Sequence, residues 1–411
     1  MRRRIVITGL GILSSIGNSV DEVSASLRDN RSGLAAVPEW VEYGFKSRVA
    51  GTVKMPDVDS LRKDFGIKAR FMDVTAIHTL ICAEQAIADS GLSPEDLNSI
   101  KTGCIASSGF SSASPFQEAI AQLQGQKKMT SAFEVTRAMA SSVSANLSNY
   151  YGIRGRSYSM SSACATSVHN VGHGAELIQQ GICDLVIAGG AEEVSPVYTS
   201  MFEGMRKVLS KSYNDQPQKA SRAFDKDRDG FVISGGAGVV ILEEYDRAVA
   251  RGAPIYGEII GFGTSTDGHD IIQPHPGGEG CQRCMEVALE NAGISPAAID
   301  YINAHGTATP AGDLAETIAI RNLFDDHPVK ISSTKSLTGH GIGAAGVHEL
   351  IYCLLMMKEG FVTASVNIDN MDSAFEDLNI VTANQVADLN TVMTNSFGFG
   401  GTNGSLIVSK V

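Results

Sequence analysis

Short apolar runs recur along the chain, separated by segments with helical periodicity. In the N-terminal half they occupy 4–9 (RIVITG), 102–107 (TGCIAS), 157–161 (SYSMS), 185–189 (LVIAG) and 238–243 (GVVILE). In the C-terminal half they occupy 255–263 (IYGEIIGFG), 299–304 (IDYINA), 330–333 (KISS), 391–395 (TVMTN) and 405–409 (SLIVS). Most are apolar on both faces. This pattern predicts buried strands of a mainly parallel sheet that is covered by helices.

Helical segments separate these strands, and the strands recur in the same order in both halves. The helical segments span 76–90, 168–180, 281–291, 311–323 and 347–358. The repeated order predicts an α/β chain of two pseudo-repeated halves, 1–252 and 253–411. Since no Pro- or Ser-rich linker separates the halves, we expect them to pack tightly. A shared site should lie where the carboxyl ends of their strands face each other.

Composition narrows the class of protein. The chain has 411 residues, of which 43% are hydrophobic, enough for a large buried core. Its net charge of −12 argues against binding to nucleic acid or to an anionic membrane. No run of 18 apolar residues occurs, so no membrane-spanning helix is predicted. The apolar start is short and broken by Gly9 and Gly11, which favours a first strand over a targeting segment, and we expect a cytoplasmic protein.

The seven cysteines are scattered through the chain, and an odd count without an export signal favours reduced thiols. Cys281 and Cys284 have CxxC spacing, but no second ligand pair stands nearby and both fall inside a predicted helix. We therefore interpret this pair as structural.

Cys164 has a different setting from the other cysteines. The segment SYSMSSACATSVHN places it at the end of a predicted strand, just before a helical run, among small neighbours. A sharp strand-to-helix turn tolerates only small neighbours and presents the side chain at a helix N-terminus, where free N–H groups favour a thiolate. This pattern predicts a nucleophile elbow with a thiol.

Two histidines of the C-terminal half follow predicted strands in Gly-rich turns. His305 lies in YINAHGTATPAGD and His340 in STKSLTGHGIGAAG, after the counterpart of the strand that precedes Cys164. If a pseudo-twofold axis relates the halves, both histidines can approach Cys164. Neutral imidazole N–H groups on a thioester oxygen would stabilise an enolate. The remaining histidines are interpreted as structural or surface residues: His78, His169, His173, His269, His275, His327 and His348.

These motifs belong to a set that runs through the whole chain. Four motifs surround the candidate site residues: SSACATS, NAHGTATPAGD, STKSLTGHGIGAAG and NSFGFGGTN. Four more occur elsewhere in the chain: VITGLGILSSIGN, AIADSGLSPED, SRAFDKDRDGFVISGGAGVVILEE and HELIYCLLMM. In this set the chain resembles the elongating β-ketoacyl-acyl carrier protein synthases of fatty acid synthesis. The resemblance is closer to the type I branch, although GTATPAGD and the flanks of GHGIGAAGVHE are shared with type II.

The resemblance implies a thiolase-like fold with a five-layered αβαβα core, in a homodimer. It implies that Cys164 accepts an acyl chain from an acyl carrier protein, and that His305 and His340 bind the malonyl thioester, favour decarboxylation and stabilise the enolate. Backbone N–H groups of Cys164 and Phe399 would form the oxyanion hole. The product would be a β-ketoacyl carrier protein and CO₂, with no cofactor beyond the phosphopantetheine that the carrier brings.

The resemblance also implies supporting residues near the histidines. Lys335 would order the site, with Asp313 and Glu316 as its charge partners. A structural monovalent cation would be held by residues that match a family site: Asn303, Glu349 and Asn395.

Further residues match the substrate-binding positions of the family. Thr307 and Thr309 would hold the phosphopantetheine arm. Phe399, in GFGG, would separate the acyl pocket from the malonyl site, and Phe202 and Phe231 would line the acyl cavity. The acidic carrier protein requires a local basic docking patch. The candidates are Lys68, Arg70, Lys127, Lys128, Arg206 and Lys207.

Two segments depart from the family pattern and leave the acyl-chain preference open. Residues 271–278 form a longer, Pro-rich loop, and 205–210 differ from the usual run of small residues. We expect both near the pantetheine entrance or the dimer-side pocket. A specialised ketosynthase of a polyketide-like or secondary lipid pathway is therefore an alternative to bulk fatty acid elongation.

Three related classes of protein would carry different site residues. A thiolase would need a second catalytic cysteine, but the terminal NSFGFGGTNG has none. An initiating ketosynthase would use Cys, His and Asn, whereas this chain offers two histidines. A non-catalytic partner subunit that measures chain length would lack the nucleophile, and Cys164 is present.

Overall fold

The computed structural model describes residues 3–205, 207–324 and 327–411. Within these ranges ten strands join in the order β10-β9-β13-β14-β8-β1-β7-β6-β4-β5. The first-half strands are β1 (Ile5–Leu13), β4 (Thr102–Ser108), β5 (Ser157–Tyr158), β6 (Leu185–Glu192) and β7 (Gly236–Glu244). The second-half strands are β8 (Gly257–Thr266), β9 (Tyr301–Asn303), β10 (Lys330–Ser332), β13 (Thr391–Gly398) and β14 (Thr402–Ser409). All ten predicted strands are confirmed.

The two halves repeat one strand order. We number the five strands of each half in chain order. From the outer edge of the sheet to its centre, both halves then show the order third, second, fourth, fifth, first. The halves join through β1 and β8, where only two residue pairs are in register, Val6 with Glu258 and Ile7 with Gly257. The repeat therefore has a pseudo-twofold character, whereas the boundary at residues 252 and 253 stays a prediction.

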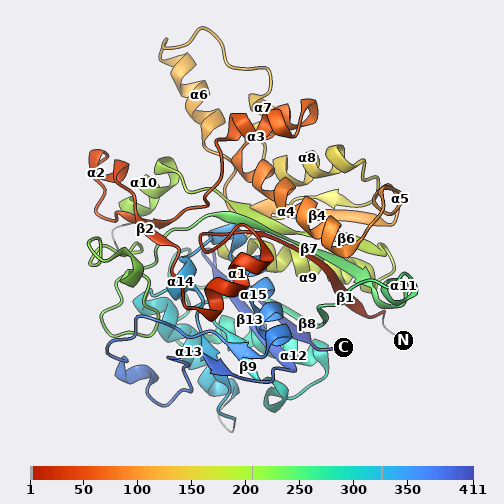
Figure 1. Cartoon of the computed structure of the whole chain (residues 1–411). Helices are drawn as coiled ribbons and strands as arrows, with labels where there is room; N and C mark the ends of the chain where they lie inside the picture. The colour runs from red at the N-terminus through yellow and green to blue at the C-terminus, as the bar shows by residue number, and fades with distance from the viewer. Residues whose placement is uncertain (1–2, 206, 325–326) are drawn as a thin grey trace.

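Helices cover both sets of strands and also separate them. α4 (Val74–Ser90) and α8 (Ser142–Tyr151) pack on the first set, and α12 (Glu279–Ala292) and α13 (Pro310–Leu323) cover the second. α9 (Thr166–Gln179) and α15 (Ala345–Glu359) lie between them, as Figure 1 shows. This arrangement confirms the five-layered αβαβα core. The predicted helices correspond to α4, α9, α12, α13 and α15.

The prediction of a mainly parallel sheet was wrong. β4 pairs in parallel with β5 and β6, and β9 with β10 and β13, but the other neighbouring strands are antiparallel. The reason is that the last strand of each half returns antiparallel between the fourth and the first. Apolar residues on both faces reveal burial, but they do not reveal strand direction.

β1 is longer than predicted because its glycines do not end it. A Cβ atom at Gly9 would lie 2.2 Å from the carbonyl oxygen of Ala86, and one at Gly11 would lie 1.8 Å from that of Cys82. Both glycines therefore allow α4 to pack directly against the strand, which continues to Leu13.

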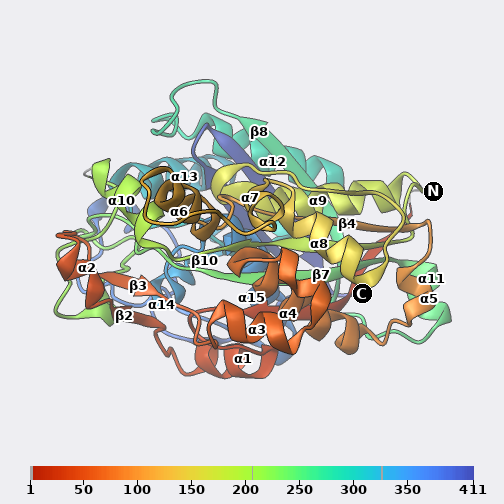
Figure 2. The ribbon, with the colours of Figure 1, turned by 90° about the horizontal axis from the view of Figure 1, so that it is seen from above.

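A cap of smaller elements projects from this body. α6 (Ser114–Leu123) and α7 (Glu134–Ala138) stand at its tip, and from above they lie over the middle of the molecule (Figures 1 and 2). The other elements are α1 (Val20–Arg28), β2 (Leu34–Ala36), α2 (Glu39–Glu42), β3 (Val49–Gly51), α3 (Val58–Asp64), α5 (Pro94–Leu97), α10 (Pro196–Gly204), α11 (Tyr245–Ala250), α14 (Lys335–Thr338), β11 (Phe361–Val362) and β12 (Gln385–Val386). Among the described residues, none of the helices has the length and apolar character needed to span a bilayer.

Candidate active site

Cys164 sits in a tight turn between β5 and the inner helix α9. The turn is a 3-10 helix, η2 (Ala163–Ala165), and Ala163 adopts a φ of +50°. The N-terminus of α9 follows at once, so Cys164 faces the free N–H groups of its first turn. The elbow packs closely on the end of β13, where a Cβ atom at Gly398 would lie 3.1 Å from the Cys164 nitrogen. The predicted elbow is therefore present.

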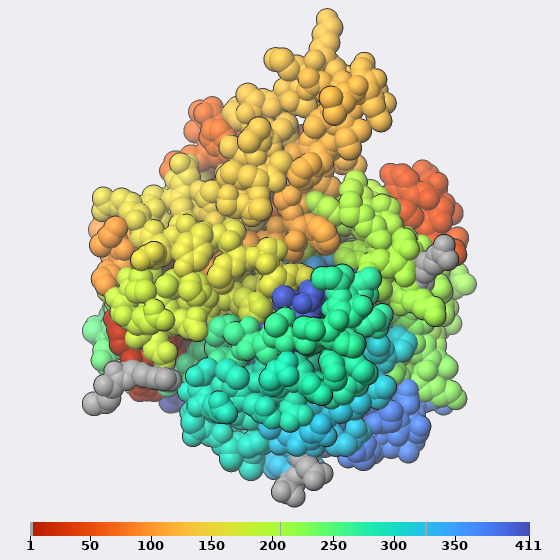
Figure 3. Space-filling view, turned by 180° about the vertical axis from the view of Figure 1, so that it is seen from behind, coloured from red at the N-terminus to blue at the C-terminus, as the bar shows by residue number. Residues whose placement is uncertain are grey.

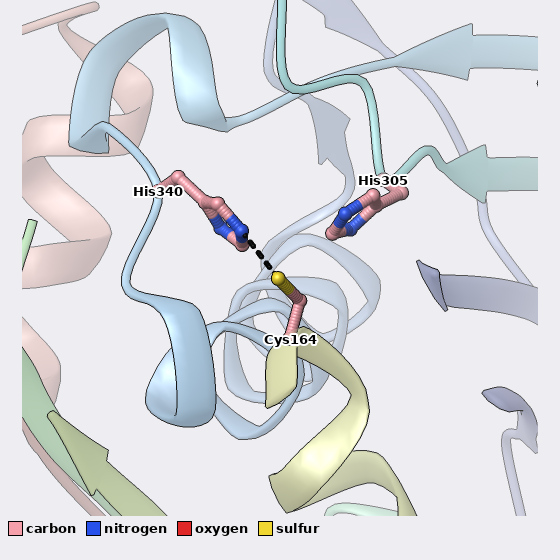
Figure 4. Close-up of side chains that lie close together, drawn as sticks. All are labelled: Cys164, His305 and His340. Carbon is pink, nitrogen blue, oxygen red and sulfur yellow. Dashed lines mark hydrogen bonds between the residues drawn. The ribbon is translucent and has the colours of Figure 1, made fainter. Parts of the chain in front are cut away.

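Both predicted histidines approach this thiol from the C-terminal half. His340 follows α14, and its Nε2 lies 3.0 Å from the Cys164 Sγ. His305 follows β9, and the two imidazole rings stand edge to face with centroids 5.1 Å apart. The sulfur and one nitrogen of each ring lie within 4.8 Å of one another. Figure 4 shows the three side chains converging on one point. The pseudo-twofold halves thus bring the three side chains together.

The backbone of each histidine is fixed by a different contact. The N–H groups of His305 and Gly306 donate to the two carboxylate oxygens of Glu316, both at 2.8 Å. His340 forms a bridge to the opposite half, because its N–H donates to the Val232 carbonyl at 2.7 Å. The imidazoles are therefore aimed from rigid positions.

Burial keeps both imidazoles neutral. His305 is 7% exposed and His340 2%. Burial lowers the pKa of each histidine well below its ordinary value, and the nearby charge of Lys335 lowers it further. The Nδ1 atoms of both rings have no hydrogen-bond partner among the described residues. Neutral rings can present either an N–H or a lone pair toward the thiol, depending on the tautomer.

The Cys164 thiol is more weakly acidic than the elbow alone suggested. Burial raises its pKa to about 12, while the charge of Lys335 and the N–H groups of Phe399 and Cys164 itself act in the opposite direction. Burial therefore opposes the thiolate that the N–H groups at the helix N-terminus favour. His340 Nε2, 3.0 Å from the sulfur, is placed to exchange a proton with the thiol, in the direction that the tautomer of the ring sets.

Lys335 is buried beneath the site but has an unexpected partner. Its ammonium group forms an ion pair with Glu349 on α15, and both side chains are 2% exposed. Asp313 instead lies 3.6 Å from Arg228 and accepts N–H groups of the chain. Glu316 holds the His305 backbone. Burial raises the pKa of Asp313 to about 6 and that of Glu316 to about 7, and the charge of Lys335 acts against this rise in both. The two carboxyls thus interact with the charge of Lys335 as predicted, although its ion-pair partner is Glu349.

The three side chains open into an apolar pocket of about 460 Å³. Every predicted substrate-binding residue lines it: Thr307, Thr309, Phe202, Phe231 and Phe399. Phe231 packs edge to face on His340 at 5.3 Å between centroids. The sequence interpretation missed other lining residues, among them Phe110, Ile342 and Cys281. Phe110, in the SSGFSS loop, stacks on Tyr198 at 4.7 Å and had no recognisable signal.

The GFGG turn and the 271–278 loop meet at the mouth of this pocket. The Gly400 N–H donates to the Ile271 carbonyl at 2.8 Å, and the Asp267 N–H donates to that of Gly401 at 2.9 Å. Gln273 and Pro274 line the pocket, as does Lys207. In the space-filling view, dark blue from the C-terminal part of the chain is visible in the middle of a hollowed face (Figure 3). Both unusual segments therefore reach the pocket.

The predicted docking residues differ in their surroundings. Those within the described residues are exposed: Lys68, Arg70, Lys127, Lys128 and Lys207. Arg206 lies outside the described residues. Lys127 forms an ion pair with Glu118, and the Arg70 guanidinium lies 4.7 Å from the centre of the Phe71 ring.

The predicted cation-binding residues are all buried. Asn303 Oδ1 and Glu349 Oε2 have no hydrogen-bond partner among the described residues. Asn395 Oδ1 instead accepts from the Ser405 hydroxyl at 2.7 Å. Two of the three predicted ligands thus have an oxygen free for a cation.

Among the remaining cysteines, Cys281 reaches the wall of this pocket. All seven are free thiols, and the six other than Cys164 are buried. Cys284 donates to the Gly263 carbonyl at 3.2 Å inside the α12 packing, and burial raises its pKa to about 12. This placement agrees with a structural Cys281–Cys284 pair.

Comparisons with known proteins agree along the chain. The profile for the β-ketoacyl synthase N-terminal domain matches residues 2–248, and that for the C-terminal domain matches residues 256–369. The chain is 50% identical to 3-oxoacyl-[acyl-carrier-protein] synthase 1 of Haemophilus influenzae, over 99% of both chains. It is 47% identical to the protein of that name from Escherichia coli K12, over 100% of this chain and 99% of the other. A crystal structure of a β-ketoacyl synthase from Burkholderia phymatum STM815 superposes with a TM-score of 0.93, at 33% identity over 100% of both chains.

Proposed function

The chain belongs to the β-ketoacyl synthase family, and we propose that its pocket carries out the condensation that elongates fatty acids on an acyl carrier protein. The observation that carries this proposal is the Cys164 thiol with two neutral imidazoles within 4.8 Å, at the base of an apolar pocket. The full-length relatives favour elongation over a specialised polyketide-like pathway.

In the first step Cys164 takes the acyl chain from the carrier thioester. The sulfur attacks the carbonyl carbon while its proton passes to His340 Nε2. The oxyanion accepts N–H groups from Cys164 and Phe399, both of which already point at the sulfur. When the carbonyl re-forms, the bond to the pantetheine sulfur breaks and His340 returns the proton to that leaving thiolate.

In the second step the two histidines act on malonyl carrier protein. For this step His340 must carry its proton on Nε2, which is the opposite tautomer from that of the first step. The N–H groups of both rings then donate to the thioester carbonyl, so the electron pair released by the departing CO₂ collects on an enolate oxygen. The enolate carbon attacks the Cys164 thioester, and the new carbon–carbon bond forms as the bond to Cys164 breaks. The cysteine leaves as a thiolate and takes up a proton from solvent, and β-ketoacyl carrier protein leaves.

Lys335 and the nearby carboxylates do not react themselves, but they set the charge and the position of the reacting side chains. Burial lowers the pKa of both imidazoles and keeps the histidines as neutral donors, and the charge of Lys335 lowers these pKa values further. The same charge opposes the rise that burial causes in the pKa of Cys164. Glu316 holds the backbone of His305, and Asp313 holds the Ala308 N–H at 3.0 Å. Removing either carboxylate should shift the turn that carries His305.

A monovalent cation fits this region as a structural element. Asn303 Oδ1 and Glu349 Oε2 are buried oxygens without a partner among the described residues, and hard cations prefer such ligands. Asn395 is less suited because its oxygen is already bonded to Ser405. Melting temperatures in K⁺ and in a bulky organic cation at equal ionic strength would test this site, since a bound ion stabilises the fold.

The carrier protein delivers both substrates through the mouth of the pocket. Thr307 and Thr309, whose hydroxyls lie 3.0 Å apart, line the path and suit the phosphopantetheine amides. Lys207, also at the mouth, and Lys68 and Arg70 supply exposed positive charge for an acidic carrier. Charge reversal at a true docking residue should raise KM for the carrier and leave kcat unchanged.

The cap supports a homodimer. Phe116, Ile120 and Leu123 follow one face of α6 at helical spacing, and they are 49%, 52% and 87% exposed. Such an apolar stripe on a projecting helix suits burial against a second copy of the chain. Ile120→Ser should shift the mass measured by analytical ultracentrifugation toward the monomer. The chain should work in the cytoplasm, which cell fractionation would check.

The experiment that tests the function is turnover of purified protein with malonyl carrier protein and a ladder of acyl carrier proteins. We expect release of CO₂ and β-ketoacyl carrier products, with a limit on chain length set by the apolar pocket. Turnover of no acyl carrier protein in the ladder would contradict the proposal. A cerulenin-type electrophile should modify Cys164 before the six buried thiols.

A further inference from the structure

The fold contains a second elbow equivalent to the one that carries Cys164. A three-residue 3-10 turn precedes each inner helix: η2 precedes α9, and η5 (Ile342–Ala344) precedes α15. Both turns begin at a non-glycine residue with positive φ, +50° at Ala163 and +45° at Ile342. Gly343 is therefore the counterpart of Cys164. Its N–H corresponds to the Cys164 N–H that points at the reacting centre.

Glu192, the last residue of β6, fills the space in front of this second elbow. Its Oε2 accepts the N–H groups of Gly343 at 3.1 Å and Gly109 at 3.0 Å, and its Oε1 accepts that of Phe110 at 3.3 Å. The side chain is 1% exposed. Burial raises the pKa of Glu192 to about 8, while these N–H groups lower it. One elbow thus awaits a substrate oxyanion, and the other already contains a carboxylate.

The three N–H groups that Glu192 holds belong to segments that shape the active site. Gly343 follows His340 by three residues, in the turn that aims this imidazole at Cys164. Gly109 and Phe110 form part of the pocket wall, as does Ile342. An N–H group that is shielded from water and loses its acceptor is destabilised, so these segments would move to find other partners.

We propose that Glu192 is a positioning residue for the condensation: its carboxylate occupies the symmetry-related counterpart of the oxyanion hole and thereby fixes both the His340 turn and the wall of the acyl pocket. The inference rests on the proposed function. Glu192 does not line the pocket and acts through Gly343, Gly109 and Phe110. Its charge also acts on Cys164, where it raises the pKa of the thiol and so opposes Lys335.

The test compares Glu192→Gln with Glu193→Gln. The neighbouring Glu193 also accepts a backbone N–H, that of Ala113 at 3.1 Å, but it does not contact the elbow. In Glu192→Gln we expect kcat for condensation to fall at least about tenfold with KM for malonyl carrier protein unchanged, because misplaced groups lose rate before binding. The pH profile of Cys164 alkylation should shift to lower pH, since a negative charge is removed. Glu193→Gln should retain the wild-type kcat and profile.

Glu192→Asp supplies the conservative variant, and it keeps the experiment decisive if the glutamine variant does not fold. It retains the charge on a shorter arm, so its alkylation profile should stay near that of the wild type while kcat lies between wild type and Glu192→Gln. Wild-type kcat in every soluble Glu192 variant would overturn the proposal, as would equal losses in Glu192→Gln and Glu193→Gln. Failure of the proposed function would be seen separately, because the wild-type protein would then not condense its substrates.

Discussion

The Cys164 elbow and the Gly343 elbow follow the same backbone path, yet only one of them faces a pocket. η2 and η5 both enter an inner helix after a residue of positive φ, and each packs against the end of a strand of the other half. Cys164 opens into the apolar cavity, whereas Gly343 is closed by Glu192. The duplicated fold therefore offers two anion-accepting turns. Chemistry is confined to the one that holds a thiol and faces both histidines.

The two elbows also differ in the charged groups that lie next to them. The Cys164 elbow has Lys335 behind it, and that charge lowers the pKa of the thiol. The Gly343 elbow already holds the carboxyl group of Glu192, whose pKa burial raises to about 8. The same backbone turn thus faces a transient oxyanion in one half and a resident carboxyl group in the other.

The largest expected effect comes from removing the positive charge of Lys335, which acts on the Cys164 elbow. Lys335→Met leaves the Glu349 carboxylate buried without its ion-pair partner, and breaking a buried pair costs about 3–5 kcal/mol. Urea denaturation at pH 7 should show a loss of this size. Lys335→Met combined with Glu349→Gln should recover part of the stability. A single variant as stable as the wild type would mean that the pair adds nothing to the fold.

The next effect separates the histidines from the thiol. His305→Ala removes one donor to the enolate oxygen, and losing such a donor costs about 10²–10³-fold in rate. Malonyl carrier protein decarboxylation should fall by this factor, while acylation of Cys164 should change less. His173→Gln serves as a control, because that ring bonds Tyr158 and Glu176 instead. Equal losses in decarboxylation and acylation would contradict the division of roles.

The pH dependence of alkylation tests the protonation of the Cys164 thiol. With the pKa of Cys164 raised to about 12, the thiolate fraction should increase tenfold per pH unit below that value. Alkylation of Cys164 by iodoacetamide should therefore accelerate about 100-fold between pH 7 and pH 9 without a plateau. Peptide mass spectrometry would give the rate at this residue. A plateau below pH 8 would show that the helix N-terminus outweighs burial after all.

The smallest expected effect concerns the Gly343 elbow. A Cβ atom at Gly343 would lie 2.4 Å from the Gly109 nitrogen and 3.0 Å from the Glu192 carboxylate. Gly343→Ala should lower the free energy of unfolding by about 1–3 kcal/mol, as overpacking does. Gly204→Ala is a suitable comparison, because Gly204 also lacks a positive φ and has no atom near its Cβ position. If Gly343→Ala costs no more than that control, the second elbow is not closely filled.

The sequence predicted the strands and the principal helices well, because apolar runs and helical periodicity directly report burial. It also placed Cys164, His305 and His340 at strand ends, and the pseudo-repeat explained why they meet. Strand direction was missed because both parallel and antiparallel central strands are apolar on two faces. Gly9 and Gly11 were interpreted as breaks, although a glycine can equally mark a place where a helix approaches a strand.

The features of the site that were not predicted concern groups that are far apart in sequence and share one buried volume. Lys335 precedes Glu349 by 14 residues, and only the packing of α15 reveals that they pair. The resting protonation of Cys164 depends on its burial by both halves, which no local motif reports. Glu192 was missed for the same reason. Its acidic neighbour and the apolar strand before it gave no sign that three distant N–H groups converge on its side chain.

The measurement that tests the central claim most directly is a comparison of two reactions in Cys164→Gln and Cys164→Ala. We predict that both variants lose condensation by at least about 10³-fold, since the acyl chain then has no sulfur to bind. Malonyl carrier protein decarboxylation, followed as released CO₂, should persist in Cys164→Gln because His305 and His340 remain in place. Condensation that survives without the thiol would contradict the assignment of Cys164 to the acyl chain. Equal loss of decarboxylation and condensation would contradict the assignment of the two histidines to the enolate.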